Sequence, residues 1–455
     1  MSFWWGLAMA PEFKSTPFGP IPQPWGLSPI GSVGTVQVGR ARSPGTDKGP
    51  NMVPYLRVAN VLDGYIDYSD VNEMNFSPTE QKKYTLQKGD ILLNEGQSTE
   101  LVGRSAIYDG PEDGYCYQNS LVNFRCGSTV EPRFARAVFK RWLDIGHFTT
   151  IVKQTTSMAH LGGERFARLA FPVPPLAEQR QLAVILDTID DAICKTEQII
   201  AKLKQVKQGL LRDLLTRGSD HNGELRDPER HSEQFKHSPM GRIPRTWQAS
   251  TLGSLLVGSP QNGVYKPGTE YGVSGSPIVR IDAFYDGVLN DVSTFKRVKL
   301  TDGERLLYRL EEGNILINRV NSIDYVGKAA HVPQLDEPVV FESNMMRLRV
   351  DRTRLDPGYA IRVLCASPAR QFFFSRAKSA IAQASVNQTD VRDVPIALPD
   401  LGEQQRIVAV LGNFESRLGA EEIVLGKIRL LKRGLMEDLL TGRVRVTRGL
   451  EQAAE

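Results

Sequence analysis

Residues 175–216 read PLAEQRQLAVILDTIDDAICKTEQIIAKLKQVKQGLLRDLLT, and residues 400–441 read DLGEQQRIVAVLGNFESRLGAEEIVLGKIRLLKRGLMEDLLT. The two stretches align without a gap and share 13 identities in 42 positions. Neither contains a proline after its first residue, and apolar residues recur in both at seven-residue intervals, which is the period of a coiled coil. We therefore predict one long helix over each stretch.

A seam of apolar side chains runs along each predicted helix at alternating heptad positions. One helix cannot hide such a stripe, so we expect the two to pair as an antiparallel coiled coil within the chain, about a pseudo-twofold axis. Helices that pack on separate domains, or an intermolecular coiled coil, are the alternatives. Arg417 and Glu421 also fall on the second seam, where they indicate either local fraying or a polar pair that fixes the register. The predicted seam consists of Leu182, Ile185, Ile189, Ile199, Leu203, Val206, Ile407, Val410, Phe414, Val424, Ile428 and Leu431.

The duplication extends beyond the helices. Residues 13–25 recur as residues 235–247 with seven of thirteen positions identical, and Gly89–Asn94 and Val102–Arg104 recur at a slightly larger offset. A slowly drifting offset is typical of tandem duplication with small insertions, so we predict two globular domains, each followed by a helix. The predicted segments are a ragged N-terminus at 1–12, a first domain at 13–171, a first helix at 172–217, a linker at 218–234, a second domain at 235–394, a second helix at 395–442 and a C-terminal tail at 443–455.

The composition is that of an ordinary globular chain. With 455 residues, a hydrophobic fraction of 41% and a net charge of +4, the chain is neither wholly disordered nor polybasic. Its four cysteines show no C-x-x-C spacing, so we expect neither a disulfide framework nor a metal site. No apolar run reaches the ~20 residues that a transmembrane helix needs, and we expect a cytoplasmic protein without a membrane partner.

The sequence lacks the common catalytic motifs. It has no G-x-x-x-x-G-K-S/T loop, no G-x-G-x-x-G after a strand, no G-x-S-x-G, no H-E-x-x-H and no Asn-Pro-Pro-aromatic tetrapeptide of the amino-methyltransferases. No carboxylate recurs in both halves with a histidine or lysine partner, and Asp90 corresponds to Asn314 in the second half. A duplicated chain without a duplicated catalytic set indicates a binding protein and not an enzyme.

Several polar residues recur in both halves and suit contacts with double-stranded DNA. Arginine and asparagine read guanine and adenine edges, and a lysine or arginine beside a glycine often contacts phosphate. The opposite interpretation is that the asparagines cap turns and the arginines pair with carboxylates. The halves differ where a base-reading surface should differ, as at Asn60 opposite Ala283. The predicted DNA-contact residues are Arg57, Asn60, Asn94, Arg104, Arg280, Asn318, Arg319 and Lys328.

In this order, and present twice, the motifs resemble those of the specificity subunit of type I restriction–modification systems. The resemblance covers nearly the whole chain. It rests on the openings of the two domains quoted above, on Pro174–Arg180 and Pro399–Gln405 at the helix starts, and on Gly209–Thr216 and Gly434–Thr441 at the helix ends. Asp400 stands where the first copy has Pro175, which we interpret as a tolerated change in a loop.

The resemblance implies a mixed α/β (α+β) fold in which two target recognition domains are separated by two long conserved helices. It also implies a non-catalytic protein that reads a bipartite DNA target, with a spacer whose length the helices set. Two modification subunits would dock on the helices and carry S-adenosylmethionine, and two restriction subunits that use ATP and Mg²⁺ can join them. No cofactor is then expected in this chain.

Two other interpretations stay open from the sequence. The chain could be the specificity portion of a split or fused methylase–endonuclease, whose modification domain lies outside these residues. It could also be a coiled-coil scaffold that does not bind DNA.

Overall fold

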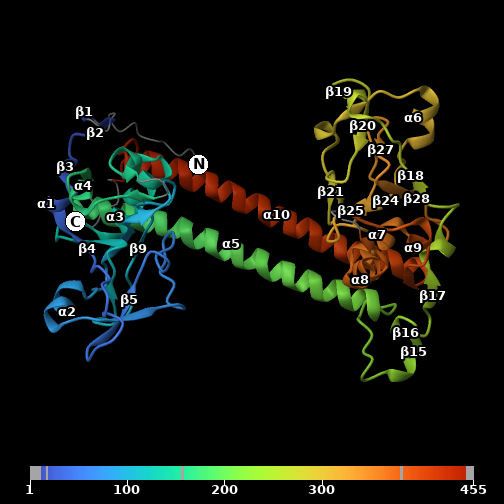
Figure 1. Ribbon diagram of the computed structural model, residues 1–455, viewed down its shortest axis with the longest axis horizontal. Helices are drawn as coiled ribbons and strands as arrows, with labels where there is room; N and C mark the ends of the chain where they lie inside the picture. The colour runs from blue at the N-terminus through green and yellow to red at the C-terminus, as the bar shows by residue number, and fades with distance from the viewer. Residues whose placement is uncertain (1–11, 17–18, 155–157, 380–382, 447–455) are drawn as a thin grey trace, which may run out of the picture. The chain divides into compact units, whose positions relative to one another are not determined.

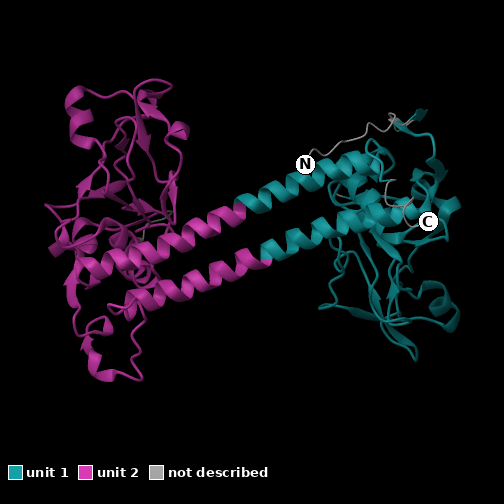
Figure 2. Ribbon diagram, turned by 180° about the vertical axis from the view of Figure 1, so that it is seen from behind, with its two compact units in different colours: residues 1–197, 423–455 teal, residues 198–422 magenta. Residues whose placement is uncertain are grey.

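The computed structural model describes residues 12–16, 19–154, 158–379 and 383–446 (Figure 1). Apart from Glu12, the predicted ragged start at 1–12 lies outside these residues, as does most of the predicted tail at 443–455. The chain forms two compact units (Figure 2). Unit 1 comprises residues 1–197 and 423–455, and unit 2 comprises residues 198–422.

The two longest helices are α5 (Leu176–Thr216) and α10 (Leu401–Leu440), and they confirm the two predicted long helices. The start of α5 and the end of α10 belong to unit 1, whereas the end of α5 and the start of α10 belong to unit 2. The boundaries of the compact units therefore fall inside the two long helices and not at the ends of the predicted segments. The reason is that each domain packs on the start of one long helix and on the end of the other.

Unit 1 is built of short strands around a central antiparallel sheet of order β4-β11-β7-β9. A second sheet of order β10-β5-β6 contains the parallel pair β10–β5, and a third has the order β12-β13-β8. The remaining pairs are β1–β2 and β14–β3. The strands are β1 (Phe13–Thr16), β2 (Gly19–Pro22), β3 (Gly26–Pro29), β4 (Gly34–Val38), β5 (Met52–Leu56), β6 (Asn72–Asn75), β7 (Ile91–Asn94), β8 (Gly96–Gln97), β9 (Ser105–Ile107), β10 (Cys116–Tyr117), β11 (Leu121–Cys126), β12 (Lys153–Gln154), β13 (Ala159–His160) and β14 (Ala170–Val173).

Short helices cover the sheets of unit 1. The amphipathic helix α3 buries Phe134, Val138 and Phe139 in the core that also holds β7 and β11. Helix α2 begins with a capping box in which Ser77 and Glu80 satisfy each other's backbone N–H groups. These helices are α1 (Ile30–Val33), α2 (Pro78–Tyr84), α3 (Pro132–Asp144) and α4 (Gly163–Ala167), with a 3₁₀ turn η1 (His147–Thr150).

Unit 2 has a longer central sheet of order β18-β28-β24-β26-β22-β21, beside sheets of order β19-β23-β20-β27 and β25-β30-β29. The pairs β15–β16 and β17–β31 complete it. The strands are β15 (Phe235–Ser238), β16 (Gly241–Pro244), β17 (Gln248–Thr251), β18 (Gln261–Asn262), β19 (Tyr271–Gly272), β20 (Ser276–Val279), β21 (Phe284–Tyr285), β22 (Gly287–Leu289), β23 (Arg297–Val298), β24 (Ile315–Asn318), β25 (Val320–Asn321), β26 (Ala329–His331), β27 (Val340–Phe341), β28 (Met345–Leu348), β29 (Lys378–Ser379), β30 (Ala384–Ser385) and β31 (Pro395–Leu398).

The short helices of unit 2 occupy corresponding places in its sequence. They are α6 (Asp302–Tyr308), α7 (Pro357–Cys365), α8 (Ser367–Arg376) and α9 (Gln388–Arg392), with the 3₁₀ turns η2 (Ser232–Gln234), η3 (Leu252–Leu255), η4 (Gly268–Glu270) and η5 (Val292–Thr294). Like α2, α6 begins with a capping box, here formed by Thr301 and Glu304.

The two units share one topology, which confirms the internal repeat and the mixed α/β fold. In the central sheets β11-β7-β9 corresponds to β28-β24-β26, and in the second sheets the parallel pair β10–β5 corresponds to β27–β20. The pairing register also agrees, since Asn94 faces Leu121 and Asn318 faces Met345. The hairpin β21–β22 extends only the central sheet of unit 2.

In unit 1, the start of α5 and the end of α10 lie side by side (Figure 1). Leu182 and Leu186 share a core with Leu439 and Met436. Further along, Asp190 pairs with Lys432, and Glu197 pairs with Arg429 at 2.6 Å. Residue numbers therefore fall along α10 as they rise along α5, so this part of the helix pair is antiparallel.

The same arrangement holds in unit 2. Lys204 lies 2.9 Å from Glu422, Lys207 lies 3.0 Å from Glu415, and Leu214 shares a core with Ile407. The predicted antiparallel pairing is thus present in each unit.

The seam follows a different phase from the predicted seam at most of the second positions. Leu182, Leu203 and Ile407 are buried as expected, but Ile200 is buried where Ile199 was predicted, and Leu411 is buried where Val410 was predicted. Ile185, Ile189, Phe414 and Ile428 are half-buried. The predicted seam residues that the structure leaves exposed are Ile199, Val206, Val410, Val424 and Leu431.

This correction has a simple geometric cause. Steps of three then four residues and steps of four then three both repeat every seven, and adjacent apolar residues such as Ile199–Ile200 satisfy either phase. The direction in which the partner helix lies selects one member of each such pair.

The Glu-Gln sequence at the start of each long helix anchors that helix to its domain. Gln404 accepts a hydrogen bond from the Asp356 N–H at 2.8 Å and donates to the carbonyls of Arg354 and Pro399. Gln179 makes the matching three bonds, to the Glu131 N–H and to the carbonyls of Thr129 and Pro174.

The adjacent glutamate closes a second contact, which we call the helix-start clasp. In unit 2, the buried carboxylate of Glu403 accepts hydrogen bonds from Trp247 Nε1 at 3.0 Å and from Arg226 Nη1 at 2.5 Å. Arg226 belongs to the predicted linker at 218–234, so this linker is fixed to the helix start. The clasp of unit 1 consists of Glu178, Trp25 and Arg445.

Candidate nucleic-acid interface

Each unit contains the same loop between two strands of its central sheet. The unit 1 loop (95–104) joins β7 to β9, and the unit 2 loop (319–328) joins β24 to β26. The N–H of Gly103 donates to the carbonyl of Asn94 at 2.9 Å, and the N–H of Gly327 donates to that of Asn318 at 2.8 Å. The two loops therefore share one backbone frame.

A glycine is required in each loop. Gly103 has a φ of +85° and Gly327 a φ of +72°, which side chains rarely tolerate, and a Cβ at either site would collide with Phe148 or Phe373. The recurring Val-Gly-Arg/Lys motif is thus explained by the close packing of an aromatic ring on the turn.

The asparagines at the start of each loop belong to this frame. Asn94 and Asn318 are 0% exposed, and their side-chain amides donate to the carbonyls of Val61 at 3.4 Å and Ile281 at 3.3 Å. Buried side chains cannot reach a base edge, so the structure corrects their prediction as DNA contacts; their amides instead tie each loop to a segment outside it. Asn60 is corrected in the same way, because it is buried and bonded to the backbone of Arg57, Asp67 and Asp70.

Three of the predicted arginines have partners within the protein. Arg57 pairs with Asp70 at 2.6 Å, and Arg280 pairs with Glu342 at 3.2 Å. Arg319 donates a long hydrogen bond of 3.4 Å to the carbonyl of Ser343. Their guanidinium groups remain partly accessible, so a role in DNA binding stays a prediction for these residues.

Arg104 and Lys328 close the two loops and differ from the other predicted residues. Among the described residues, neither makes a hydrogen bond or an ion pair through its side chain. The Lys328 ammonium lies over the Tyr285 ring, 3.5 Å from its centroid. Burial lowers the pKa of Lys328, while Asp286 and Asp282 oppose the shift.

The side chains on the shared frame are different in the two units. In unit 1, Glu95 bonds to His160 of the neighbouring strand β13 at 3.0 Å. In unit 2, Arg319 stands at the position of Glu95, and Tyr325 stands at that of Leu101. Two equal frames with unlike side chains could present two different binding surfaces.

A hairpin beside each loop was missed by the sequence analysis. Strand β8 of the unit 1 loop pairs with β13, which pairs with β12, and β25 of the unit 2 loop pairs with β30, which pairs with β29. Both outer strands start with an exposed lysine, Lys153 and Lys378. The two lysines stand at equivalent positions of the two halves, and this equivalence is a signal that the sequence offered. Strands of two residues, however, are too short to show a periodicity from which the hairpins could be predicted.

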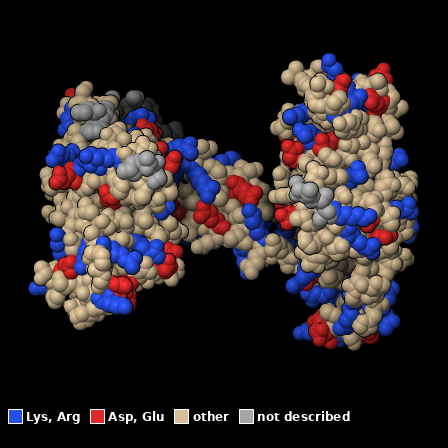
Figure 3. All heavy atoms as spheres, in the orientation of Figure 1, with Lys and Arg blue, Asp and Glu red and all other residues tan. Residues whose placement is uncertain are grey.

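Charges of both signs are interspersed over the face of each unit that Figure 3 shows. Within the described part of the chain, no group of three or more histidine, cysteine, aspartate or glutamate side chains is placed to hold a metal ion. The helices of the described residues include none that is long and apolar enough to cross a membrane.

The family model for the type I restriction modification DNA specificity domain matches the chain twice, over residues 22–205 and residues 244–425. The chain belongs to this family. The two matches fall one on each half of the duplicated sequence, and each includes one of the loops described above and most of one long helix.

Known members resemble the chain over most of its length. It is 23% identical over 442 residues to a protein named the MjaX type I restriction enzyme specificity subunit of Methanocaldococcus jannaschii. This alignment covers 96% of this chain and 97% of the relative. It is 25% identical over 409 residues to the EcoKI specificity subunit of Escherichia coli K12, covering 86% and 82%. The solved type I restriction–modification S subunit of M. genitalium has the same fold, with a TM-score of 0.54 at 14% identity over 95% of this chain and 99% of that one.

Proposed function

We propose that the chain is the sequence-recognition subunit of a type I restriction–modification complex, and that each unit reads one half of a bipartite DNA target. The observation that carries this proposal is the duplicated loop frame. Asn94 and Asn318 hold two loops in one backbone conformation, while the exposed side chains on them differ. A rigid frame with variable side chains suits proteins that discriminate between sequences.

The chemistry would reside on partner subunits. Modification subunits would bring S-adenosylmethionine and methylate the half-sites, and restriction subunits would bring ATP and Mg²⁺. The proposal therefore gives this chain a positioning role without catalysis, in the cytoplasm, where DNA is accessible.

The outer faces of α5 and α10 supply a surface for two modification subunits. Apolar side chains that the helix pair leaves exposed would be covered by such partners, because exposed apolar patches often mark interaction sites. The exposed set on the two helices is Val184, Ile199, Val206, Val410, Ile423, Val424, Leu430 and Leu431.

DNA binding by the full chain tests the proposal. The chain, alone and co-expressed with its modification subunit, is titrated with a pool of random duplexes in an electrophoretic shift assay at several salt concentrations. We expect retention of duplex at low salt and a steep loss as salt rises, because counterions are released when lysine and arginine neutralise phosphates.

A co-expressed complex that never retains duplex at low salt would contradict the proposal and would favour a scaffold without DNA. Single-stranded DNA of the same length is the control, and we expect weaker retention of it. A chain variant with Lys153→Glu and Lys378→Glu tests whether the two exposed hairpins add to phosphate binding.

A further inference from the structure

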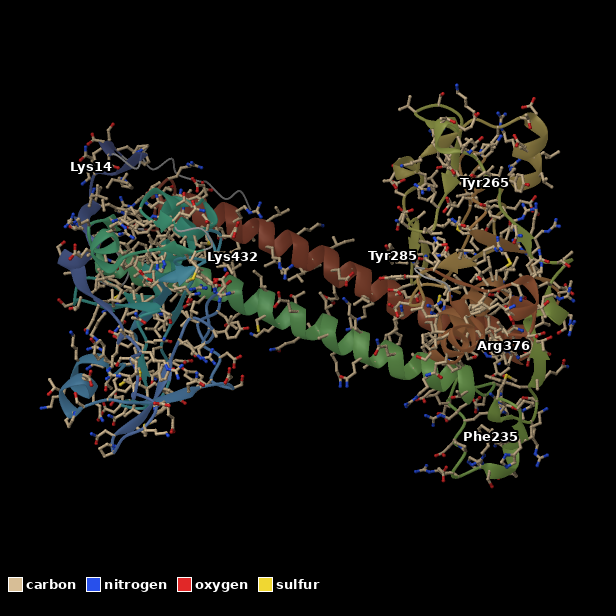
Figure 4. The ribbon with its side chains drawn as sticks, in the orientation of Figure 1. Lys14, Phe235, Tyr265, Tyr285, Arg376 and Lys432 are labelled. Carbon is tan, nitrogen blue, oxygen red and sulfur yellow. The ribbon has the colours of Figure 1, made fainter. Side chains whose placement is uncertain are left out.

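Unit 2 has a surface hollow that involves its loop and its edge hairpin. The hollow has a volume of about 200 Å³ and is lined by Tyr285, Asp286, Asp324, Tyr325, Lys328, Ala329, Cys365 and Arg370. Tyr285 is 53% exposed and Tyr325 is 48% exposed, so the rim is accessible from solvent. Figure 4 marks Tyr285 on this unit.

The hairpin that forms one wall is rigid. Tyr285 of β21 pairs with Val288 of β22, and only Asp286 and Gly287 lie between them. Both have a positive φ, +47° and +87°, as in the tight Asp-Gly turns that match the twist of the flanking strands. This geometry places Asp286 in the turn of the hairpin at the edge of the central sheet.

Three aromatic rings hold the Lys328 ammonium in place without accepting an ordinary hydrogen bond from it. The Lys328 ammonium lies 3.5 Å, 5.1 Å and 5.5 Å from the ring centroids of Tyr285, Phe284 and Tyr325. Ring faces attract the positive charge but accept no ordinary hydrogen bond, and Lys328 donates none to the described residues. Lys328 therefore retains donor capacity for an external acceptor.

Acceptors face the same hollow. The side-chain carboxylates of Asp286 and Asp324 take part in no hydrogen bond or ion pair among the described residues. Arg370 uses its two Nη atoms to hold the loop, donating to the carbonyls of Val326 and Asp324 at 2.7 Å each. Within the described part of the chain, the hollow thus offers an ammonium and two carboxylates that have no hydrogen-bond or ion-pair partner.

Unit 1 lacks this combination. Leu62 and Leu101 stand where unit 2 has Tyr285 and Tyr325. The counterpart of Asp286 is Asp63, whose carboxylate is paired with Arg136 and Lys140, each at 3.0 Å. As far as the described residues show, the corresponding place in unit 1 thus lacks both the aromatic rings and the unpaired carboxylate.

We propose that this hollow reads one G·C base pair in the half-site of unit 2, with Lys328 donating to guanine N7 and O6 and Asp286 accepting from cytosine N4. This inference rests on the proposed function. Lysine suits the two guanine acceptors, and aspartate suits the cytosine amino group. The β21–β22 hairpin, which carries Asp286 in its turn, forms the edge of the central sheet, where a duplex can approach it. Phosphate is disfavoured as the ligand because two free carboxylates would repel it.

The test is the sequence preference of the complex of full chain and modification subunit, selected from random duplexes and sequenced. Wild type is compared with Lys328→Met, which keeps the aliphatic stem, and with Asp286→Asn, which tolerates a positive φ. We expect both variants to lose ~10- to 100-fold of the preference for one and the same G·C pair, a magnitude typical of one base contact, while the other half-site is unchanged. Arg104→Met is the matched control in unit 1 and should leave this base pair unaffected.

Several results would overturn the inference. One is an unchanged motif with a uniform drop in affinity and a shallower salt dependence, which identifies Lys328 as a phosphate contact. Another is an unchanged motif with unchanged affinity. Equal melting temperatures of the variants and wild type separate these results from misfolding. A wild-type complex that enriches no motif would reject the proposed function itself, which is a different outcome from a motif that the variants fail to alter.

Discussion

At the residue scale, the glutamate that begins each long helix has an unusual set of partners. The buried carboxylate of Glu403 is shared by an indole and a guanidinium, and that of Glu178 has the same two partners in unit 1. A buried ion pair adds little over an apolar pair, but removing one member leaves an uncompensated charge. These residues should therefore tolerate almost no substitution.

We predict that Glu403→Ala lowers the free energy of unfolding of unit 2 by about 3–5 kcal/mol, because Arg226 and the Trp247 indole both lose their acceptor. Urea unfolding of the full chain measures it. Glu229→Ala, at an exposed position of the linker, is the control and should change the stability by less than about 0.5 kcal/mol. A loss for Glu403→Ala no larger than that of the control would contradict the clasp.

A second residue-scale prediction concerns pH. Hydrogen bonds from Arg40 and from the Ser77 N–H lower the pKa of Glu80 to about 2, below its ordinary value of 4.5. Its stabilising effect is therefore complete above pH ~4.5 and is lost as the pH falls toward 2. We expect wild type to be more stable than Glu80→Gln at pH 6, with the difference shrinking below pH 4.5. Thermal unfolding at pH 3 to 6 measures this difference, and a constant gap would contradict it.

Residue roles were the least predictable feature of the sequence. From the sequence alone, Asn94 fits two roles, a side chain that contacts a base and a residue of a turn, because either role can place an amide near a glycine. Only its burial decides between them, and burial depends on strand β11, which pairs with β7 from far along the chain. The sequence also offered no sign that the side chains of Arg104 and Lys328 would lack a hydrogen-bond partner among the residues that the structure describes.

At the element scale, the two long helices followed from the sequence alone, since their seven-residue period extends over about forty residues. The phase of the seam did not. Ile199 and Ile200 are both apolar, and the choice between them depends on the position of the partner helix. The short strands, several only two residues long, carry too little pattern for any prediction.

The seam phase can be tested with adjacent residues. We predict that Ile200→Asp disrupts the packing of α5 on α10, because Ile200 is 7% exposed, whereas Ile199→Asp is tolerated at 42% exposure. The expected loss for Ile200→Asp is at least about 3 kcal/mol, as for other buried unpaired charges. Urea unfolding of both variants distinguishes them.

Equal losses for the two variants would place both residues in the seam and contradict the observed phase. Ile199→Asp should instead weaken binding of the modification subunit, which size-exclusion chromatography of the co-expressed complex detects.

At the scale of the whole molecule, the sequence predicted the duplication and the two long helices. The sequence did not predict that each domain packs against the start of one long helix and the end of the other. That division depends on contacts such as Arg445 with Glu178, which join residues far apart in the sequence.

The proposed role of the helices as a spacer yields a prediction at this scale. One heptad is inserted between Glu197 and Gln198 and a second between Ile428 and Arg429, which lies opposite because Glu197 pairs with Arg429, so that the added turns can pair. Seven residues lengthen a helix by ~10.5 Å, so the preferred DNA spacer should grow by about three base pairs. An unchanged spacer would contradict the role, and a heptad in α5 alone is the control that should destabilise the helix pair.

The central claim is that the two units of this chain recognise the two different halves of a bipartite DNA target. The most direct test is to map DNA methylation in cells that carry the modification subunit, with and without this chain. We predict that methylation appears only with the chain, at two short unlike sequences separated by a fixed number of unspecified base pairs. Methylation at one continuous motif, or an identical map without the chain, would contradict the account.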